Sequence, residues 1–214
     1  MTTFGKFVSI IVLIGIGTTG YFFLNKKDKD SALPSTTKQY INDTYNFTID
    51  YPNTLTTTTF QSFHNLSTTW RTFAQEGEQG IPIVSIPIYR IDQGGVATGK
   101  PYPLFFDTEV RIGVSNATST CYTTDAGYNN QTVTDITINS IPFKKFLFSD
   151  AAMMQFMEGI SYRTIHNNQC YVLEQIKTGS HYRDETMSTG TPESTLQNYY
   201  MQGEEIIKTF TFTK

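Results

Sequence analysis

Charged residues are scarce in this chain, and neither sign is in marked excess. The 214 residues contain 16 Lys and Arg against 19 Asp and Glu, which gives a formal net charge of −3. A nucleic-acid-binding surface needs clustered basic side chains to neutralise phosphates, and no stripe of Lys or Arg is present. The charged fraction of 16% also argues against long helices laced with surface ion pairs. Composition therefore disfavours nucleic acid as a partner.

Recognisable catalytic motifs are missing as well. No Gly-x-Ser-x-Gly segment is present to carry the nucleophile of a serine hydrolase. Gly94-Gly95 lacks the later glycine and the lysine of a phosphate-binding loop. Asp107 and Glu109 share one strand parity, but two carboxylates are too few to favour a calcium site. We therefore predict no catalytic residue, no cofactor-binding residue and no metal ligand.

Cysteine is nearly absent, since Cys121 and Cys170 are the two in the chain. In an oxidising compartment they can form a disulfide, whereas in a reducing one they would be two buried thiols. A thiol enzyme is the alternative, because His166 lies near Cys170 along a predicted hairpin and could serve as its base. The default interpretation of His166 is a surface or turn-stabilising imidazole.

The one long apolar run lies near the N-terminus. Residues 7–24 contain no charged residue and are long enough to span a hydrocarbon core as a helix. No small-x-small cleavage site follows the run, which favours an uncleaved signal-anchor over a cleaved signal peptide. Basic residues on the two sides nearly balance, so the positive-inside rule does not fix the orientation. We place the C-terminal part outside, because its composition resembles that of an exported domain.

The predicted organisation has four parts. Residues 1–6 are a short N-terminal tail, residues 7–24 the transmembrane signal-anchor helix, residues 25–39 a polar linker and residues 40–214 a β-rich domain.

Strand patterns dominate this last part. Residues 45–51 alternate apolar and polar side chains with a period of two. Tight hairpin turns are predicted at Asn139-Ser140 and at Asn167-Asn168, because asparagine tolerates the positive φ that such turns require. Residues 81–89 are apolar on both parities, as in a central strand, although their two prolines weaken that assignment.

Two helices are predicted. Thr191, Pro192 and Glu193 have the cap, first-position and dipole preferences of a helix start. The apolar face of this helix consists of Leu196, Tyr200, Gly203 and Ile207. Residues 151–157 are predicted as a second, short helix. The expected fold class is therefore α+β, an antiparallel sheet flanked by helices.

Four phrases of the chain together resemble PsbP-like domains, which have the antiparallel α-β-α sandwich of the photosystem PsbP family. Small membrane-anchored bacterial proteins have the same domain plan. These phrases are Tyr45-x-Phe47-x-Ile49-x-Tyr51-Pro52, Ile138-Asn139-x-Ile141-Pro142-Phe143-Lys144-Lys145-Phe146, Tyr162-Arg163-Thr164-x-His166-Asn167-x-x-Cys170-Tyr171 and Ile206-Ile207-Lys208-Thr209-Phe210-Thr211-Phe212. The resemblance covers residues 40–214. It implies a PsbP-like sandwich and an exported, anchored location, and it transfers no functional residue.

The expected function is that of a membrane-anchored extracytoplasmic protein that binds or scaffolds an envelope partner without catalysing a reaction. The alternative is an exported hydrolase or thiol enzyme that uses Cys170 and His166. The two differ in the state of Cys170, because an oxidised Cys121–Cys170 pair leaves no thiol nucleophile.

Overall fold

The computed structural model describes residues 36–59, 81–92, 103–122, 133–152, 155–180 and 190–214. The chain divides into two compact units, Met1–Ser31 and Ala32–Lys214. The predicted tail and signal-anchor helix lie outside the described residues, as does most of the predicted linker. Among the described residues, no helix is both long and apolar enough to cross a membrane.

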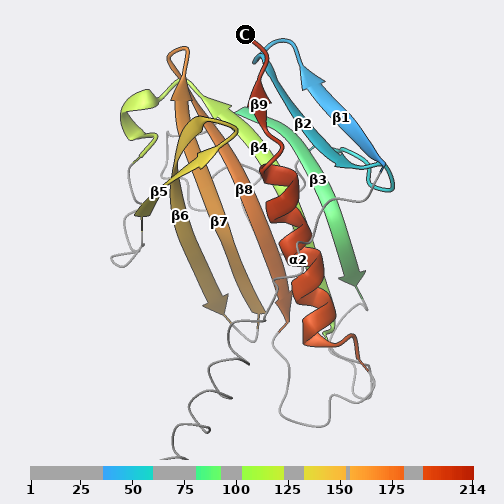
Figure 1. Cartoon of the computed structure of the whole chain (residues 1–214). Coiled ribbons are helices and arrows are strands. Elements are labelled where there is room, and N and C mark those ends of the chain that lie inside the picture. Colours follow the sequence, from blue (N-terminus) through green and yellow to red (C-terminus); the bar gives the residue numbers. More distant parts are fainter. Residues whose placement is uncertain (1–35, 60–80, 93–102, 123–132, 153–154, 181–189) are drawn as a thin grey trace, which may run out of the picture. The chain divides into compact units, whose positions relative to one another are not determined.

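Two antiparallel sheets make up most of the described residues (Figure 1). The smaller sheet has the order β1-β2-β9, with β1 at Thr37–Asn42, β2 at Phe47–Pro52 and β9 at Thr211–Phe212. The larger sheet has the order β3-β4-β8-β7-β6-β5. Its strands are β3 (Ile81–Asp92), β4 (Phe105–Ser115), β5 (Val133–Ile138), β6 (Ile141–Ala152), β7 (Gln155–His166) and β8 (Gln169–Ser180).

Both predicted hairpin turns are confirmed. Asn139 and Ser140 join β5 to β6 with φ values of 45° and 67°, and Asn167 and Asn168 join β7 to β8 with 48° and 59°. The left-handed backbone at these positions matches the right-handed twist of the strands. The local sequence therefore fixes the register of both hairpins.

The described residues contain one α-helix, α2 (Glu193–Ile207), which lies along one face of the larger sheet, and a short 3-10 turn, η1 (Thr118–Thr120). Pro192 occupies the N-cap position, so the helix begins one residue later than predicted. The predicted apolar face is confirmed, because Leu196, Tyr200, Gly203 and Ile207 are all buried.

The predicted α+β class, with an antiparallel sheet flanked by helices, is wrong. The structure is mostly β, and the described residues contain one α-helix rather than several. The residues predicted as a second helix instead extend β6 to Ala152 and begin β7 at Gln155. Pairing along the register of the β6–β7 ladder outweighs the helix propensity of alanine and methionine here.

Strand β3 forms an edge of the larger sheet and not its centre. Pro82 and Pro87 lie beside the two irregularities in its register with β4. Proline donates no ladder hydrogen bond, so an edge position is the one that tolerates it. The predicted central strand is thus corrected to an edge strand.

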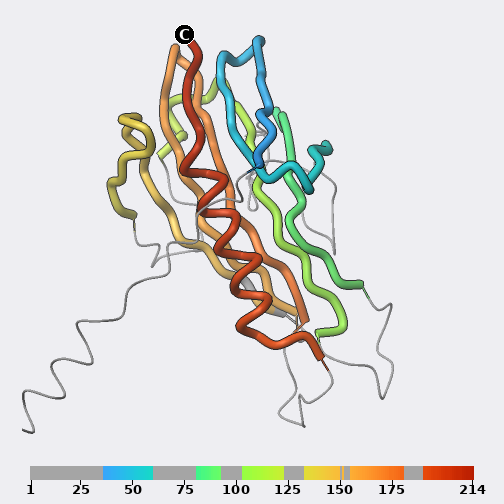
Figure 2. The backbone as a smooth tube through the Cα atoms, turned by 45° about the vertical axis from the view of Figure 1, so that its right-hand side comes forward, coloured from blue at the N-terminus to red at the C-terminus, as the bar shows by residue number. Residues whose placement is uncertain are grey.

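One face of the larger sheet, the smaller sheet and α2 share the main hydrophobic core. Its fully buried members include Phe47, Ile49, Ile112, Leu173, Ile206 and Phe210. The helix packs chiefly on β3, β4 and β8 (Figures 1 and 2). We call this surface the helix face of the larger sheet and the other surface its opposite face.

Gly159 on β7 allows a close approach between strands and an aromatic ring. A Cβ atom there would lie 2.3 Å from the Cζ of Phe148 and 2.5 Å from the carbonyl oxygen of Gln175. We expect Gly159→Ala to lower the free energy of unfolding by about 1–3 kcal/mol, because the ring must move. Gly203→Ala is the control, since its nearest neighbour is 3.1 Å away. Urea unfolding should separate the two variants, and equal stabilities would contradict this packing.

Candidate functional site

His166 and Cys170, the residues of the predicted thiol alternative, lie on opposite faces of the larger sheet. The His166 ring stacks on Phe212 with centroids 3.8 Å apart, and it contacts the Tyr171 ring on the helix face. Cys170 precedes Tyr171, and successive side chains of a strand point to opposite faces. The arrangement therefore gives no support to a Cys170–His166 catalytic pair. His166 instead fixes the C-terminal strand, with its Nε2 3.2 Å from the Lys214 carbonyl oxygen.

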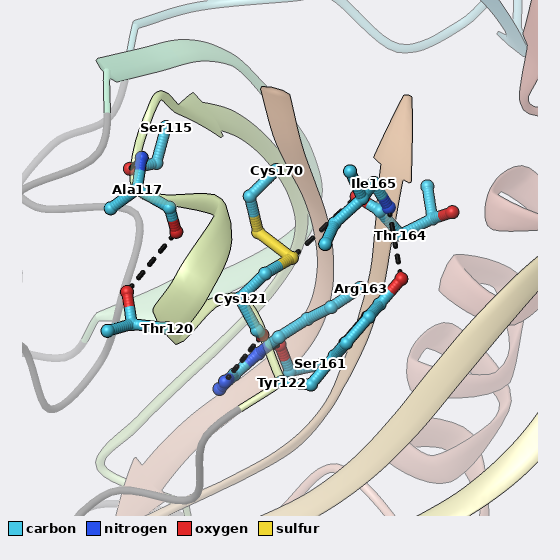
Figure 3. Close-up of a disulfide and its surroundings, with 10 residues drawn as sticks. All are labelled: Ser115, Ala117, Thr120, Cys121, Tyr122, Ser161, Arg163, Thr164, Ile165 and Cys170. Atoms are coloured by element: carbon cyan, nitrogen blue, oxygen red, sulfur yellow. Dashed lines mark hydrogen bonds between the residues drawn. A yellow bond between two sulfur atoms is a disulfide. The ribbon is translucent and has the colours of Figure 1, made fainter. Parts of the chain in front are cut away.

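Cys121 and Cys170 form a disulfide, with Cα atoms 5.6 Å apart (Figure 3). Both residues are buried, with Cys121 2% exposed and Cys170 fully covered. The bond links strand β8 to the segment after β4, across 49 residues of sequence. Of the two states that the sequence allowed for these cysteines, the structure has the disulfide, and neither sulfur is a thiol.

Cys121 and Tyr122, held in place by this disulfide, lie against the C-terminal end of β7. This end lies beyond the last β6–β7 register pair, at Lys144 and Arg163, and is therefore not paired with β6. The Ile165 amide donates a hydrogen bond to the Tyr122 hydroxyl at 3.1 Å, and Arg163 Nη1 donates one to the Cys121 carbonyl at 3.4 Å (Figure 3). Unpaired backbone groups at a strand edge attract other strands. The disulfide therefore anchors a cover for this part of the edge.

Charged side chains gather on the opposite face of the larger sheet. Glu109, Arg111, Arg163 and Glu174 form this group, which we call the charged cluster. Arg111 and Glu174 are register partners across β4 and β8, and both are 3% exposed. Arg163 is 4% exposed. The two acids and two bases balance, as buried charges require.

Hydrogen bonds tie the charged cluster to its neighbours. Arg111 Nε donates to Glu109 Oε1 at 2.7 Å, and the Ser85 hydroxyl donates to the other carboxylate oxygen of Glu109. Arg163 Nε donates to the Ser161 hydroxyl at 3.0 Å, and the guanidinium lies 4.3 Å from the Phe146 ring centroid. These charges are engaged with the protein itself, which favours a structural role over a catalytic one.

Asp107 lies next to the charged cluster and holds its proton unusually tightly. Burial raises the pKa of Asp107 from 3.8 to about 6, the Glu109 carboxylate adds to the increase, and Arg90 and Arg111 oppose it. Arg90 Nε lies 3.9 Å from the Asp107 carboxylate. The Asp107–Glu109 pair considered above as a calcium candidate thus has guanidinium groups beside it.

Asp107→Asn is expected to flatten the pH dependence of stability. Because the folded-state pKa is raised, the folded chain binds more protons than the unfolded chain, and stability falls as the pH rises from 3.8 through about 6. The variant should therefore gain stability relative to the wild type above this window and match it below. Urea unfolding across the window is the measurement, and an unchanged pH slope in the variant would contradict the assignment.

A pocket lies on the helix face of the larger sheet, lined by residues of β6, β7, β8 and α2. Its volume is about 290 Å³. The residues that line it include Leu147, Ser149, Glu158, Ile160, Lys177 and Tyr200. Register pairs place Leu147 beside Ile160, and Glu158 between Ser149 and Lys177, so three strands form the floor.

Sequence reasoning missed both the pocket and the charged cluster. Each is assembled from strands far apart in sequence, and only the charge alternation of residues 107–111 hinted at a polar face. Across the residues that the structure describes, no three His, Cys, Asp or Glu side chains are placed to hold a metal ion.

Comparisons with known proteins find similarity to solved structures and none to family models or curated proteins. No family model matches the sequence, and no curated protein does. The chain is similar to the solution structure of cyanobacterial PsbP (CyanoP) from Synechocystis sp. PCC 6803, with a TM-score of 0.37 and 7% sequence identity, over 87% of this chain and 98% of that one. This solved structure carries the name of the family that the four phrases resemble, and no statement about fold or function rests on it.

Proposed function

We propose that this chain is a membrane-anchored extracytoplasmic protein of the cell envelope that binds or scaffolds a partner. The buried Cys121–Cys170 disulfide carries the proposal. Disulfides persist in exported proteins and are rare in the reducing cytosol. The charge-free residues 7–24 supply a means of export and of retention in the membrane.

A binding role, and not a catalytic one, fits the site chemistry. Both sulfurs are part of the disulfide, His166 packs on the C-terminal strand, and Arg111 of the charged cluster is paired with Glu109. A catalytic group needs access to a substrate and a matched proton donor or acceptor within reach. The pocket beside α2 could hold a small partner group.

Protease accessibility tests the location. The full-length chain with a C-terminal epitope tag is expressed in bacterial cells, which are converted to spheroplasts and treated with external protease. We expect the tag to be removed while a cytosolic marker survives, and we expect the chain to stay in the carbonate-washed membrane pellet. A variant lacking residues 7–24 is the control and should leave the pellet. Protection of the full-length chain's tag until lysis would overturn the proposal.

A further inference from the structure

Lys177 is the cation of the pocket beside α2. Its side chain is 16% exposed, and its ammonium lies 3.1 Å from the Glu158 carboxylate. The same ammonium lies 5.1 Å from the centroid of the Tyr200 ring and 5.9 Å from that of Phe156. A lysine ammonium has three N–H donors, and Glu158 is its one ion-pair partner among the described residues. Lys177 therefore has N–H groups left to donate to a ligand at the floor of the pocket.

Tyr200 adds a second donor to the pocket lining. Its hydroxyl makes no hydrogen bond within the described part of the chain, although its carbonyl accepts one from Gln175. Burial raises the pKa of Tyr200, and the Glu158 and Glu204 carboxylates raise it further, so the hydroxyl stays protonated at neutral pH. Lys177 and Tyr200 can thus both donate hydrogen bonds to an acceptor.

The remaining lining offers an apolar surface. Leu147 is 46% exposed, and its register partner Ile160 is half-buried. Because both side chains line the pocket, they can pack against an apolar ligand body. The pocket thus places a hydrogen-bond donor, Lys177, beside the aliphatic side chains of Leu147 and Ile160. Such a lining suits an amphipathic ligand with a hydrogen-bond acceptor at one end.

We propose that this pocket binds a small amphipathic carboxylate, with the carboxylate on Lys177 and the apolar body over Leu147 and Ile160. A ligand cation fits less well, because Lys177 would repel it and Glu158 is already paired. Glu158 is 47% exposed and can turn toward solvent when a ligand carboxylate replaces it. The inference deepens the proposed binding role, which it assumes, but it is independent of where the domain resides.

The test uses 4-phenylbutyrate as the probe, with 4-phenylbutyramide as the neutral analogue and 4-phenylbutylamine as the cationic one. The full-length protein is held in zwitterionic lipid nanodiscs, empty nanodiscs are the blank, and binding is followed by calorimetry. We expect the acid to bind about tenfold or more tightly than the amide, as a charge-assisted hydrogen bond implies. The amine should bind no better than the amide.

Three variants assign the binding to the pocket. Lys177→Met should remove the preference for the acid, and Glu158→Gln should strengthen acid binding by removing the competing carboxylate. Lys145→Met is the matched control, because Lys145 lies on β6 over the Tyr162 ring and outside the pocket lining. Its acid affinity should be unchanged.

Equal affinity for acid and amide, no saturable binding of the acid, or retained preference in Lys177→Met would overturn the proposal. If Lys177→Met does not fold, Glu158→Gln decides alone, and weaker acid binding in that variant contradicts the pairing. Failure of these tests leaves the proposed membrane location untouched, since protease accessibility measures that separately.

Discussion

Arg111→Met is expected to lower the free energy of unfolding by about 3–5 kcal/mol, the usual cost of removing one partner from a buried ion pair. Arg111 is 3% exposed, donates to Glu109 and faces Glu174 across the β4–β8 ladder. Methionine fills much of the same volume but leaves two carboxylates on this face with less compensating charge. Urea unfolding at neutral pH measures the loss.

Two further variants separate charge from packing in the charged cluster. Glu109→Gln combined with Arg111→Met should recover a large part of the loss, because it also removes one carboxylate. Arg90→Met is the surface control: its side chain is 49% exposed and its ion pairs are 3.9 and 4.0 Å long, so about 1 kcal/mol or less is expected. A loss for Arg111→Met no larger than that for Arg90→Met would contradict the structural role of the charged cluster.

Removing the disulfide with Cys121→Ala and Cys170→Ala together is expected to cost about 4 kcal/mol of unfolding free energy. The bond closes a loop across 49 residues, and the chain-entropy model gives about 4 kcal/mol for a loop of this size. Replacing both cysteines avoids a stray thiol.

Unfolding of the wild type with and without reductant provides the control for that double variant. The reduced wild type should unfold at nearly the same urea concentration as the double variant, and the oxidised wild type at a higher one. A loss of unfolding free energy below about 1 kcal/mol would contradict a stabilising role of the disulfide.

Local features of the fold could be predicted from the sequence. The turns at Asn139-Ser140 and Asn167-Asn168 rest on neighbouring residues alone, and the buried face of α2 follows from spacing along one helix. Each depends on interactions within a few residues, which is where sequence patterns are most informative.

Features set by strand order could not be predicted in the same way. The segment from 151 to 157 has helix-forming residues, yet pairing with neighbouring strands makes it part of β6 and β7. The predicted fold class is wrong for this reason. The predicted central position of β3 is wrong because it was based on the apolar run of that strand, whereas Pro82 and Pro87 indicate an edge. A central strand that is buried on both faces and an edge strand such as β3 can have similar apolar sequence patterns.

The candidate sites depend on register to an even greater degree. The separation of Cys170 and His166 onto opposite faces follows from alternation along the β7–β8 hairpin, whose register the turn at Asn167-Asn168 sets. The pairing of Cys121 with Cys170, in contrast, depends on how distant parts of the chain come together. The contact of Lys177 with Glu158 needs β7 and β8 paired in one register, and that with Tyr200 needs α2 to cross them.

The proposal that this domain works outside the cytoplasm is tested most directly by the redox state of its two cysteines in cells. Cells producing the full-length chain are quenched in acid, and free thiols are then alkylated with a polymer-linked maleimide that retards the chain on a gel. We predict no retardation without prior reduction and addition at both cysteines after it. Full modification of Cys121 and Cys170 without reductant, in chain taken straight from growing cells, would contradict the account.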